Sequence, residues 1–199
     1  GGGVDATDEA DYIAYVTGRL PMLRRLAANL VGDPHRGDDL VQQAITRLYT
    51  HWRRASKADN LDAYVYKILL RAFLDEQRRT WALVQLRAAF AESDSADTSP
   101  VASEARDPAG AVADRLFLRE ALATLPPKQR AVLVLRFLAD RSVDEVAQIL
   151  DIAPGTVKSQ TYDGLNALRR LLGQPEASDA PSTAARSRPD SPLDSGVTP

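Results

Sequence analysis

Apolar residues recur at helical spacing throughout the first half of the chain. From Tyr12 to Leu30 they repeat every three or four residues, which predicts a helix. Gly18 and Pro21 interrupt this stretch and are predicted to bend the helix or to split it in two. Thr7, followed by two acids, is a candidate N-cap for this first helix.

The most regular amphipathic pattern follows a clear helix start signal. Asp33 can cap the helix and Pro34 suits its first position. From Asp38 to Trp52 the apolar positions form a wide face, with one ladder of Leu40, Ala44, Leu48 and Trp52 and an adjacent one of Val41, Ile45 and Tyr49. The opposite face carries short polar side chains suited to a specific contact: Asp39, Gln42, Gln43, Thr46 and Arg47.

A third helix is predicted from Leu61 to about Arg79, after a polar loop and with Asn60 as its N-cap. Its apolar stripe consists of Leu61, Val65, Ile68, Leu69 and Ala72. Three cations align on another face: Lys67, Arg71 and Arg78. Aromatic residues lie on or beside the helix: Tyr64, Tyr66, Phe73 and Trp81. Two interpretations remain open, either a solvated basic face with buried rings or a surface where cations hold phosphates and rings stack on an unpaired base.

The second half contains a pattern typical of a helix-turn-helix. After a helix from Lys128 to Ala139, Ser142 and Glu145 have the spacing of a capping box. A turn from Asp151 to Pro154 then precedes a helix that runs to about Leu172. In a helix-turn-helix this second helix enters the major groove, and its candidate DNA contacts are Thr156, Lys158, Ser159, Gln160 and Thr161. The alternative is a plain helical hairpin.

The composition shifts twice and divides the chain. Residues 92–113 and 174–199 are poor in large apolar side chains and rich in Ser, Asp, Ala and Pro, so they cannot bury enough surface to offset ordering. We therefore predict an all-α protein of two small helical domains, 11–91 and 114–173, joined by a flexible linker. Residues 1–10 are predicted to be a cloning remnant and N-terminal tail, and residues 174–199 a disordered tail of unassigned role.

The composition also excludes several classes of protein. The 199 residues include no cysteine, so disulfides, thiolate zinc sites and thiol nucleophiles are excluded, which fits a reducing cytosol. No apolar run approaches the ~20 residues that cross a bilayer, so we expect no membrane insertion. We expect neither an enzyme nor a cofactor, because His35 and His51 lack ligand-spaced carboxylates and the neighbouring Asp38 and Asp39 point in different directions on a helix.

The net charge of -2 is unevenly distributed. Residues 4–91 carry 13 basic and 11 acidic side chains, and residues 114–173 carry 9 and 7. The negative balance therefore lies in the predicted linker and tail. Neither domain is basic enough to bind DNA by charge alone.

Four strings in order resemble an extracytoplasmic-function (ECF, group 4) sigma factor of bacterial RNA polymerase, within the sigma-70 family. They are GDPHRGDDLVQQAITRLYTHW, AYVYKILLRAFLDEQRR, LPPKQRAVLVLRFLADRSVDEVAQIL and APGTVKSQ. The resemblance covers about residues 11–172. The Ala- and Arg-rich composition is similar to that of an actinobacterial member.

The resemblance implies a cytoplasmic initiation factor, on the nucleoid when in holoenzyme, which binds core polymerase and selects promoter DNA. The first domain would contact the clamp coiled coil of the largest subunit through Asp39, Gln42, Gln43 and Thr46, and the polymerase flap is a further expected partner. It would melt the minus-ten element through Asn60, Tyr64, Lys67, Arg71 and Arg78. The second domain would read the minus-thirty-five element. An anti-sigma factor is a further partner that the resemblance allows.

The chain departs from the family pattern at the predicted DNA surfaces. Arg71 replaces a common asparagine and adds a positive charge. Gln160 and Asp163 replace common arginines in the recognition helix, so we expect weaker binding of the upstream element. Ala153 stands where a serine usually caps the recognition helix. The competing function, a free-standing helix-turn-helix regulator, explains the second domain but leaves the polar face of residues 38–52 without a role.

Overall fold

The computed structural model describes residues 6–90 and 110–173, and every regular element in these ranges is helical. The first domain comprises α1 (Ala6–Val31), α2 (Pro34–Thr50), the short α3 (Trp52–Ala55) and α4 (Leu61–Phe90). The second comprises α5 (Gly110–Ala123), α6 (Pro127–Leu133), the π-helical turn η1 (Val134–Leu138), α7 (Val143–Leu150) and α8 (Pro154–Leu171). The predicted all-α class is confirmed.

Helices α1 and α2 pack closely because a glycine lies at their contact. A Cβ on Gly37 would lie 2.9 Å from the backbone nitrogen of Ala28, so only glycine allows this approach. The first ladder predicted for α2 is fully buried, with Trp52 at the start of α3. The adjacent ladder is buried only in part, since Tyr49 at its end is exposed. Asp33 caps α2 as predicted: its Oδ1 accepts from the amides of His35 (2.7 Å) and Arg36 (3.1 Å), which lowers the pKa of the Asp33 carboxyl.

Two predictions about α1 need correction. The helix begins at Ala6, inside the predicted N-terminal tail, so Thr7 lies within its first turn rather than at the N-cap. It also continues through Gly18 and Pro21 without division, so of the two predicted alternatives, a bend or a split, the split does not occur. Proline removes one hydrogen bond to the carbonyl four residues earlier, and Thr17, which supplies that carbonyl, is exposed to solvent.

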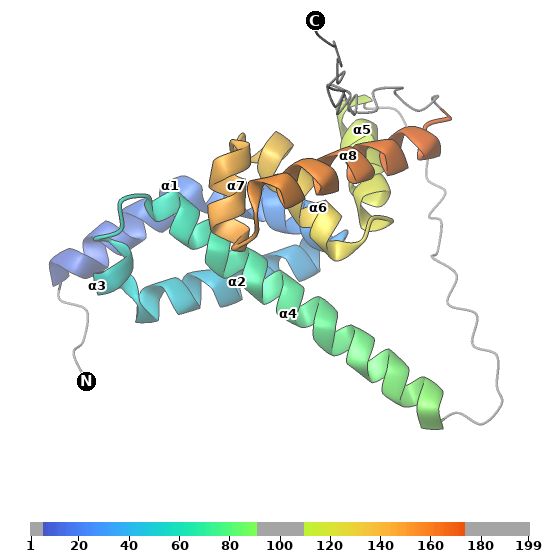
Figure 1. Cartoon of the computed structure of the whole chain (residues 1–199). Helices are drawn as coiled ribbons and strands as arrows, with labels where there is room; N and C mark the ends of the chain where they lie inside the picture. The colour runs from blue at the N-terminus through green and yellow to red at the C-terminus, as the bar shows by residue number, and fades with distance from the viewer. Residues whose placement is uncertain (1–5, 91–109, 174–199) are drawn as a thin grey trace, which may run out of the picture.

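Helix α4 ends later, and helix α5 begins earlier, than the sequence predicted. Helix α4 runs eleven residues past Arg79 because residues 80–90 are mostly good helix formers without a stop signal. Figure 1 shows this half of α4 projecting away from the body. Helix α5 begins at Gly110, inside the predicted linker. The rest of that linker and the predicted C-terminal tail lie outside the described residues.

The second domain follows its predicted signals. The Ser142 hydroxyl accepts from the amide of Glu145 (3.2 Å) and the Glu145 carboxylate accepts from the amide of Ser142 (2.7 Å), which completes the capping box of α7. Asp151 then takes a left-handed conformation (φ 58°) in the turn. Helix α8 starts at Pro154, and Ala153 at its N-cap provides no side-chain hydrogen bond, as predicted.

The two domains pack directly on each other. Helix α1 contacts α5, α6 and η1, and α4 contacts α6 and α7. Buried hydrophobic residues of both domains form a single cluster. In Figure 1 the second domain, coloured yellow to orange, lies against α1 and the first half of α4. The two domains are therefore in contact in this structure, although a flexible linker would also permit them to lie apart.

Candidate functional site

The polar face of α2 is a continuous exposed surface. Asp39, Gln42, Gln43 and Thr46 are all exposed, while Leu40, Ala44 and Leu48 on the opposite side are buried. Within residues 6–90 and 110–173, none of these four polar side chains forms a hydrogen bond or ion pair. Their polar groups are thus free for a partner, and the buried ladder holds the helix in a fixed orientation.

The candidate residues of α4 differ in how available they are. Arg71 is exposed and Lys67 is half-buried, and neither forms an ion pair with an acidic residue of the described segments. Arg78 pairs with Asp75 one turn away. Asn60 caps α4 as predicted, since its Oδ1 accepts from the amide of Ala63 at 2.9 Å. Two unpaired cations therefore remain for a phosphate backbone.

The aromatic rings around α4 separate into two groups. Tyr66 and Phe73 are buried in the core and cannot stack on a base, as the alternative of buried rings predicted. Tyr64 is half-buried. Trp81 is 64% exposed on the projecting part of α4. A base-stacking interpretation therefore applies only to Tyr64 and Trp81.

The candidate residues of α8 lie at its start and are only partly open. Thr156, Lys158 and Ser159 are exposed, whereas Gln160 and Thr161 are half-buried. The Ser159 hydroxyl donates to the Thr156 carbonyl (3.1 Å) and the Thr161 hydroxyl to the Val157 carbonyl (2.7 Å), so both protons are already used within the helix. Lys158 is the one cation among these five candidates, and it is exposed.

A cavity of about 640 Å³ brings the two predicted DNA surfaces together. It is lined by Arg78 and Trp81 of α4, by Lys128 of α6 and by Gln160 of α8. Side chains that the resemblance assigns to two different promoter elements thus face one another across a single space. No pattern in the amino-acid sequence indicates this juxtaposition.

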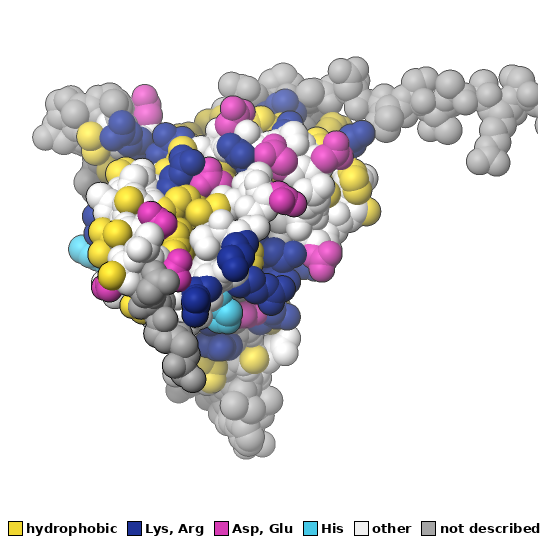
Figure 2. Space-filling model, turned by 90° about the vertical axis from the view of Figure 1, so that its left-hand side faces the viewer, with side chains coloured by type: hydrophobic (Ala, Val, Ile, Leu, Met, Phe, Trp, Pro, Cys, Tyr) yellow, Lys and Arg dark blue, Asp and Glu magenta, His cyan; other side chains and the backbone are white. Residues whose placement is uncertain are grey.

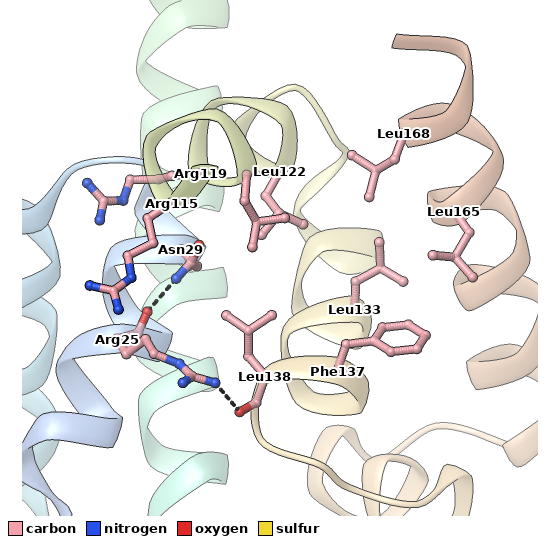
Figure 3. A pocket seen from close by; sticks show the side chains of 11 residues that line it. Arg25, Asn29, Arg115, Arg119, Leu122, Leu133, Phe137, Leu138, Leu165 and Leu168 are labelled. Carbon is pink, nitrogen blue, oxygen red and sulfur yellow. Dashed lines mark hydrogen bonds between the residues drawn. The ribbon is translucent and has the colours of Figure 1, made fainter. Parts of the chain in front are cut away.

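A second cavity of about 520 Å³ lies between α1 and the second domain, as Figure 3 shows. Its wall is mainly apolar, with Leu122 of α5, Leu133, Phe137 and leucines of α8. Arg25, Arg115 and Arg119 lie along one side of it. An apolar floor with a cationic rim fits an amphipathic segment that carries carboxylates.

Charge is concentrated locally despite the small net charge. Figure 2 shows Lys and Arg side chains gathered around a histidine near the centre of the face that it displays, with acidic groups more widely scattered. Such a cluster raises the local affinity for phosphate.

Asp62 joins the start of α4 to α1 in the first domain. Its carboxylate accepts a hydrogen bond from the Tyr15 hydroxyl (2.7 Å) and pairs with Arg19 (2.7 Å). Burial, and then this hydrogen bond, raise the pKa of Tyr15.

Metal sites and membrane spans are two further features that bear on function. No group of three or more His, Cys, Asp or Glu side chains in the described segments is arranged to hold a metal ion. None of the helices in the described part of the chain has the length and apolar character needed to cross a membrane.

Comparisons with known proteins identify both domains. The model of sigma-70 region 2 matches residues 16–83, and that of sigma-70 region 4 matches residues 116–168. An RNA polymerase sigma-E factor of Streptomyces avermitilis is 35% identical over 162 residues, which cover 81% of this chain and 85% of the relative. The ECF RNA polymerase sigma factor SigL of Mycobacterium tuberculosis is 29% identical, with 85% and 93% covered.

A solved structure shares the fold across both domains. The sigma factor RpoE from Bartonella quintana, in complex with the anti-sigma factor NepR, superposes with a TM-score of 0.63 at 25% identity. The match covers 82% of this chain and 97% of that one.

Proposed function

The chain belongs to the ECF RNA polymerase sigma factors of the sigma-70 family, and we propose from this membership how its surfaces share the work of initiation. It directs RNA polymerase to promoters and acts where the polymerase acts, in the cytoplasm. A free-standing helix-turn-helix regulator would need no region 2, which occupies residues 16–83 here. Sigma factors act by binding, and we propose that the chain itself catalyses no reaction and joins the nucleoid within holoenzyme.

The exposed polar face of α2 is the proposed docking surface for core polymerase. The observation that supports this most is that Asp39, Gln42, Gln43 and Thr46 are all exposed and unpaired within the described segments, on a helix whose other face is buried. One acid and three short polar groups suit the polar surface of a coiled coil. The clamp coiled coil of the largest subunit is the proposed partner, with the flap as a second contact for the other domain.

The proposed minus-ten surface lies on α4 and the loop before it. Lys67 and Arg71 supply positive charge for the phosphates of the melted strand, and Tyr64 supplies a half-buried ring beside them. Asn60 keeps its side-chain N–H groups for a base while its oxygen caps the helix. Arg78 must exchange its ion pair with Asp75 for a phosphate, so we assign it a smaller contribution.

The proposed minus-thirty-five surface is the start of α8. Lys158, with Thr156 and Ser159, would contact bases and phosphates. Gln160 and Thr161 are half-buried, so they would contact DNA only after the cavity beside Gln160 opens. Because Gln160 and Asp163 carry no positive charge, the domain holds DNA through few cations.

An anti-sigma factor is the proposed negative regulator. The Bartonella sigma factor is seen with such a partner. In this chain the apolar cavity with Arg25, Arg115 and Arg119 at its rim offers a site for an acidic amphipathic helix.

Run-off transcription with core polymerase tests the whole proposal. Genomic fragments from the source organism serve as templates, and core polymerase without the chain is the control. We expect promoter-specific transcripts that require the chain. Absence of any transcript, together with failure to co-purify with core polymerase at low salt, would contradict the proposed function.

A further inference from the structure

A buried arginine joins the two domains. Arg130 of α6 is only 7% exposed, and no carboxylate of the described residues pairs with it. Its guanidinium donates to three backbone carbonyls: Leu30 of α1 at 2.6 Å, Ala123 of α5 at 2.6 Å and Leu125 at 2.9 Å. One of these carbonyls belongs to the other domain, so the side chain bridges the interface.

The carbonyls around Arg130 compensate its charge. Leu30 lies in the last turn of α1 and Ala123 ends α5, and carbonyls at helix C-termini lack intrahelical partners and carry partial negative charge. The ring of Phe73, from α4, lies 5.8 Å from the guanidinium carbon. Burial, and then Arg36, lower the pKa of Arg130 from its usual value.

A second arginine makes the reverse contact. Arg25 of α1 donates to the carbonyl of Leu138, the last residue of η1, at 3.0 Å, and Figure 3 shows this bond across the cavity. Each domain therefore extends an arginine to a helix C-terminus of the other. Arg141 of the second domain also lies over the Tyr66 ring of the first, at 5.9 Å.

The backbones approach closely at one more point. Gly32 directly follows α1 with φ 79°, and a Cβ placed on it would lie 3.2 Å from the Cβ of Ala123. The backbone of Gly32 therefore lies directly against the side chain of Ala123. The interface is thus fixed by two arginines and by a glycine where the chain turns.

This closed arrangement does not match the spacing of a promoter. Elements at minus ten and minus thirty-five are about 25 base pairs apart, and therefore about 85 Å apart on straight B-DNA. Arg78 and Gln160, one from each proposed DNA surface, line the same cavity of about 640 Å³. The closed chain cannot place both surfaces on their elements at once.

We propose that Arg130 and Arg25 form a reciprocal latch that holds the free chain closed, and that this autoinhibitory contact must open before the chain reads a promoter. The inference rests on the proposed function. The polar face of α2 is exposed in the closed state, so core polymerase can dock before the latch opens.

A disulfide across the interface tests the latch directly. Because the chain has no cysteine, the double variant Gly32→Cys with Ala123→Cys contains only the introduced pair. The Cβ separation of 3.2 Å is close to the 3.5–4.5 Å of disulfides, so a small shift allows the bond. The reduced form of the same variant is the control for any strain at Gly32.

We expect the free chain to crosslink rapidly. Run-off transcription should then fall to the level that the uncrosslinked fraction supports, and reduction of the disulfide should restore it. Full transcription by the crosslinked form would overturn the latch, as would failure to crosslink, because Gly32 and Ala123 would then not be adjacent in solution. If the wild-type and reduced forms are also inactive, the proposed function itself has failed.

Two neighbouring arginines provide a matched pair of single variants. Arg25 bonds across the interface, whereas Arg24 pairs with Asp38 inside the first domain (3.1 Å). Dyes on cysteines introduced at the exposed positions Ser56 and Leu171 report the distance between the domains. We expect Arg25→Ala to raise the open population about threefold and Arg24→Ala to leave it unchanged. Equal effects of both variants, or none, would overturn the role of Arg25.

Discussion

The exposed face of α2 and the start of α8 are two of the proposed binding surfaces, and they differ in how far they are exposed to solvent. All four candidate residues of α2 are exposed and unpaired within the described segments, whereas Gln160 and Thr161 of α8 are half-buried. Gln160 lines a cavity that it shares with α4. In the closed chain the proposed surface for polymerase is thus exposed, and the proposed DNA surface of α8 is partly buried.

The N-termini of α2 and α8 also differ in how they are capped. Two amides of α2 donate to the side chain of Asp33, while α8 starts at Ala153 with no side-chain cap. The partner helix α7 has a complete capping box. The recognition helix is therefore held by its packing, with Val157 buried against the domain, rather than by its own N-terminus.

Reversing a charge on the α2 face should have the largest effect on function. Asp39→Arg places a cation at the centre of the proposed docking surface, and we expect affinity for core polymerase to fall about 30-fold or more. Co-purification and titration with core polymerase measure it. Asp114→Arg, the same change at an exposed position of α5, is the control. Equal binding of Asp39→Arg and the wild type would remove the contrast between the two surfaces.

Filling the glycine between α1 and α2 should destabilise the first domain. The new methyl group of Gly37→Ala would meet the backbone of Ala28, which cannot move aside, so we expect a loss of about 2 kcal/mol in the free energy of unfolding. Gly164→Ala in α8 meets the movable side chain of Leu133 and should cost less. Gly18→Ala, with no atom within 4 Å, should stabilise by about 0.5 to 1 kcal/mol.

Urea unfolding measures the Gly37 and Gly18 variants. The fluorescence of the buried Trp52 reports on the first domain, and circular dichroism follows Gly164→Ala in the second. If Gly37→Ala and Gly18→Ala have the same stability, the close contact of α1 and α2 is not present in solution.

Restoring cations on α8 should strengthen its DNA surface. Gln160→Arg and Asp163→Arg should each steepen the dependence of log affinity on log salt by about 0.9 for every additional phosphate that the domain neutralises. At position 160 the new charge also lies in the cavity with Arg78 and Lys128, so it opposes closure. Binding to an upstream-element duplex over a salt series measures the slope, with Asp114→Arg as the control for Asp163→Arg. An unchanged slope and footprint would mean that α8 does not lie on the phosphates as proposed.

Exchanging caps between α7 and α8 should produce smaller, opposite changes. Ser142→Ala removes the cap of α7 and should cost about 1 kcal/mol of stability in the second domain. Ala153→Ser should add up to about 1 kcal/mol, because Ala153 already has the extended backbone of an N-cap (φ -67°, ψ 145°). Hydrogen exchange of the α7 and α8 amides measures both. Identical protection in the two variants would contradict the assigned caps.

The capping box should also give the second domain a weak dependence on pH. The amide of Ser142 donates to Glu145 and is the main cause of its lowered pKa, with Arg141 a smaller one. A lowered folded-state pKa stabilises fully above the ordinary glutamate value, and this stabilisation is lost as pH falls through the folded-state pKa. Glu145→Gln keeps a hydrogen-bonding side chain without titration, so thermal stability between about pH 6 and pH 3 should fall less in this variant. Parallel curves for both proteins would exclude the contribution.

Local signals in the sequence predicted most of the helices. Asp33 with Pro34, and Ser142 with Glu145, mark helix starts because a cap needs only residues a few positions apart. The buried ladder of α2 follows in the same way from its spacing. The end of α4 was not predictable from such a signal, because no glycine or proline stops the helix at Arg79.

The candidate site was predicted less completely. The exposure of the α2 face matches its pattern, but the burial of Tyr66 and Phe73 depends on which elements cover α4. Spacing alone cannot separate a ring that packs in the core from one that faces a ligand. The roles of all these residues remain proposals that the variants above test.

The order of amino acids thus set where helices start, which of their faces are apolar and which family the chain belongs to. The folded arrangement alone decided that Arg130 and Arg25 close the two domains on each other. Their partners are backbone carbonyls, which every residue carries, so no choice of side chain marks them in advance. Only the packing of α1 against α5, α6 and η1 selects which carbonyls those are.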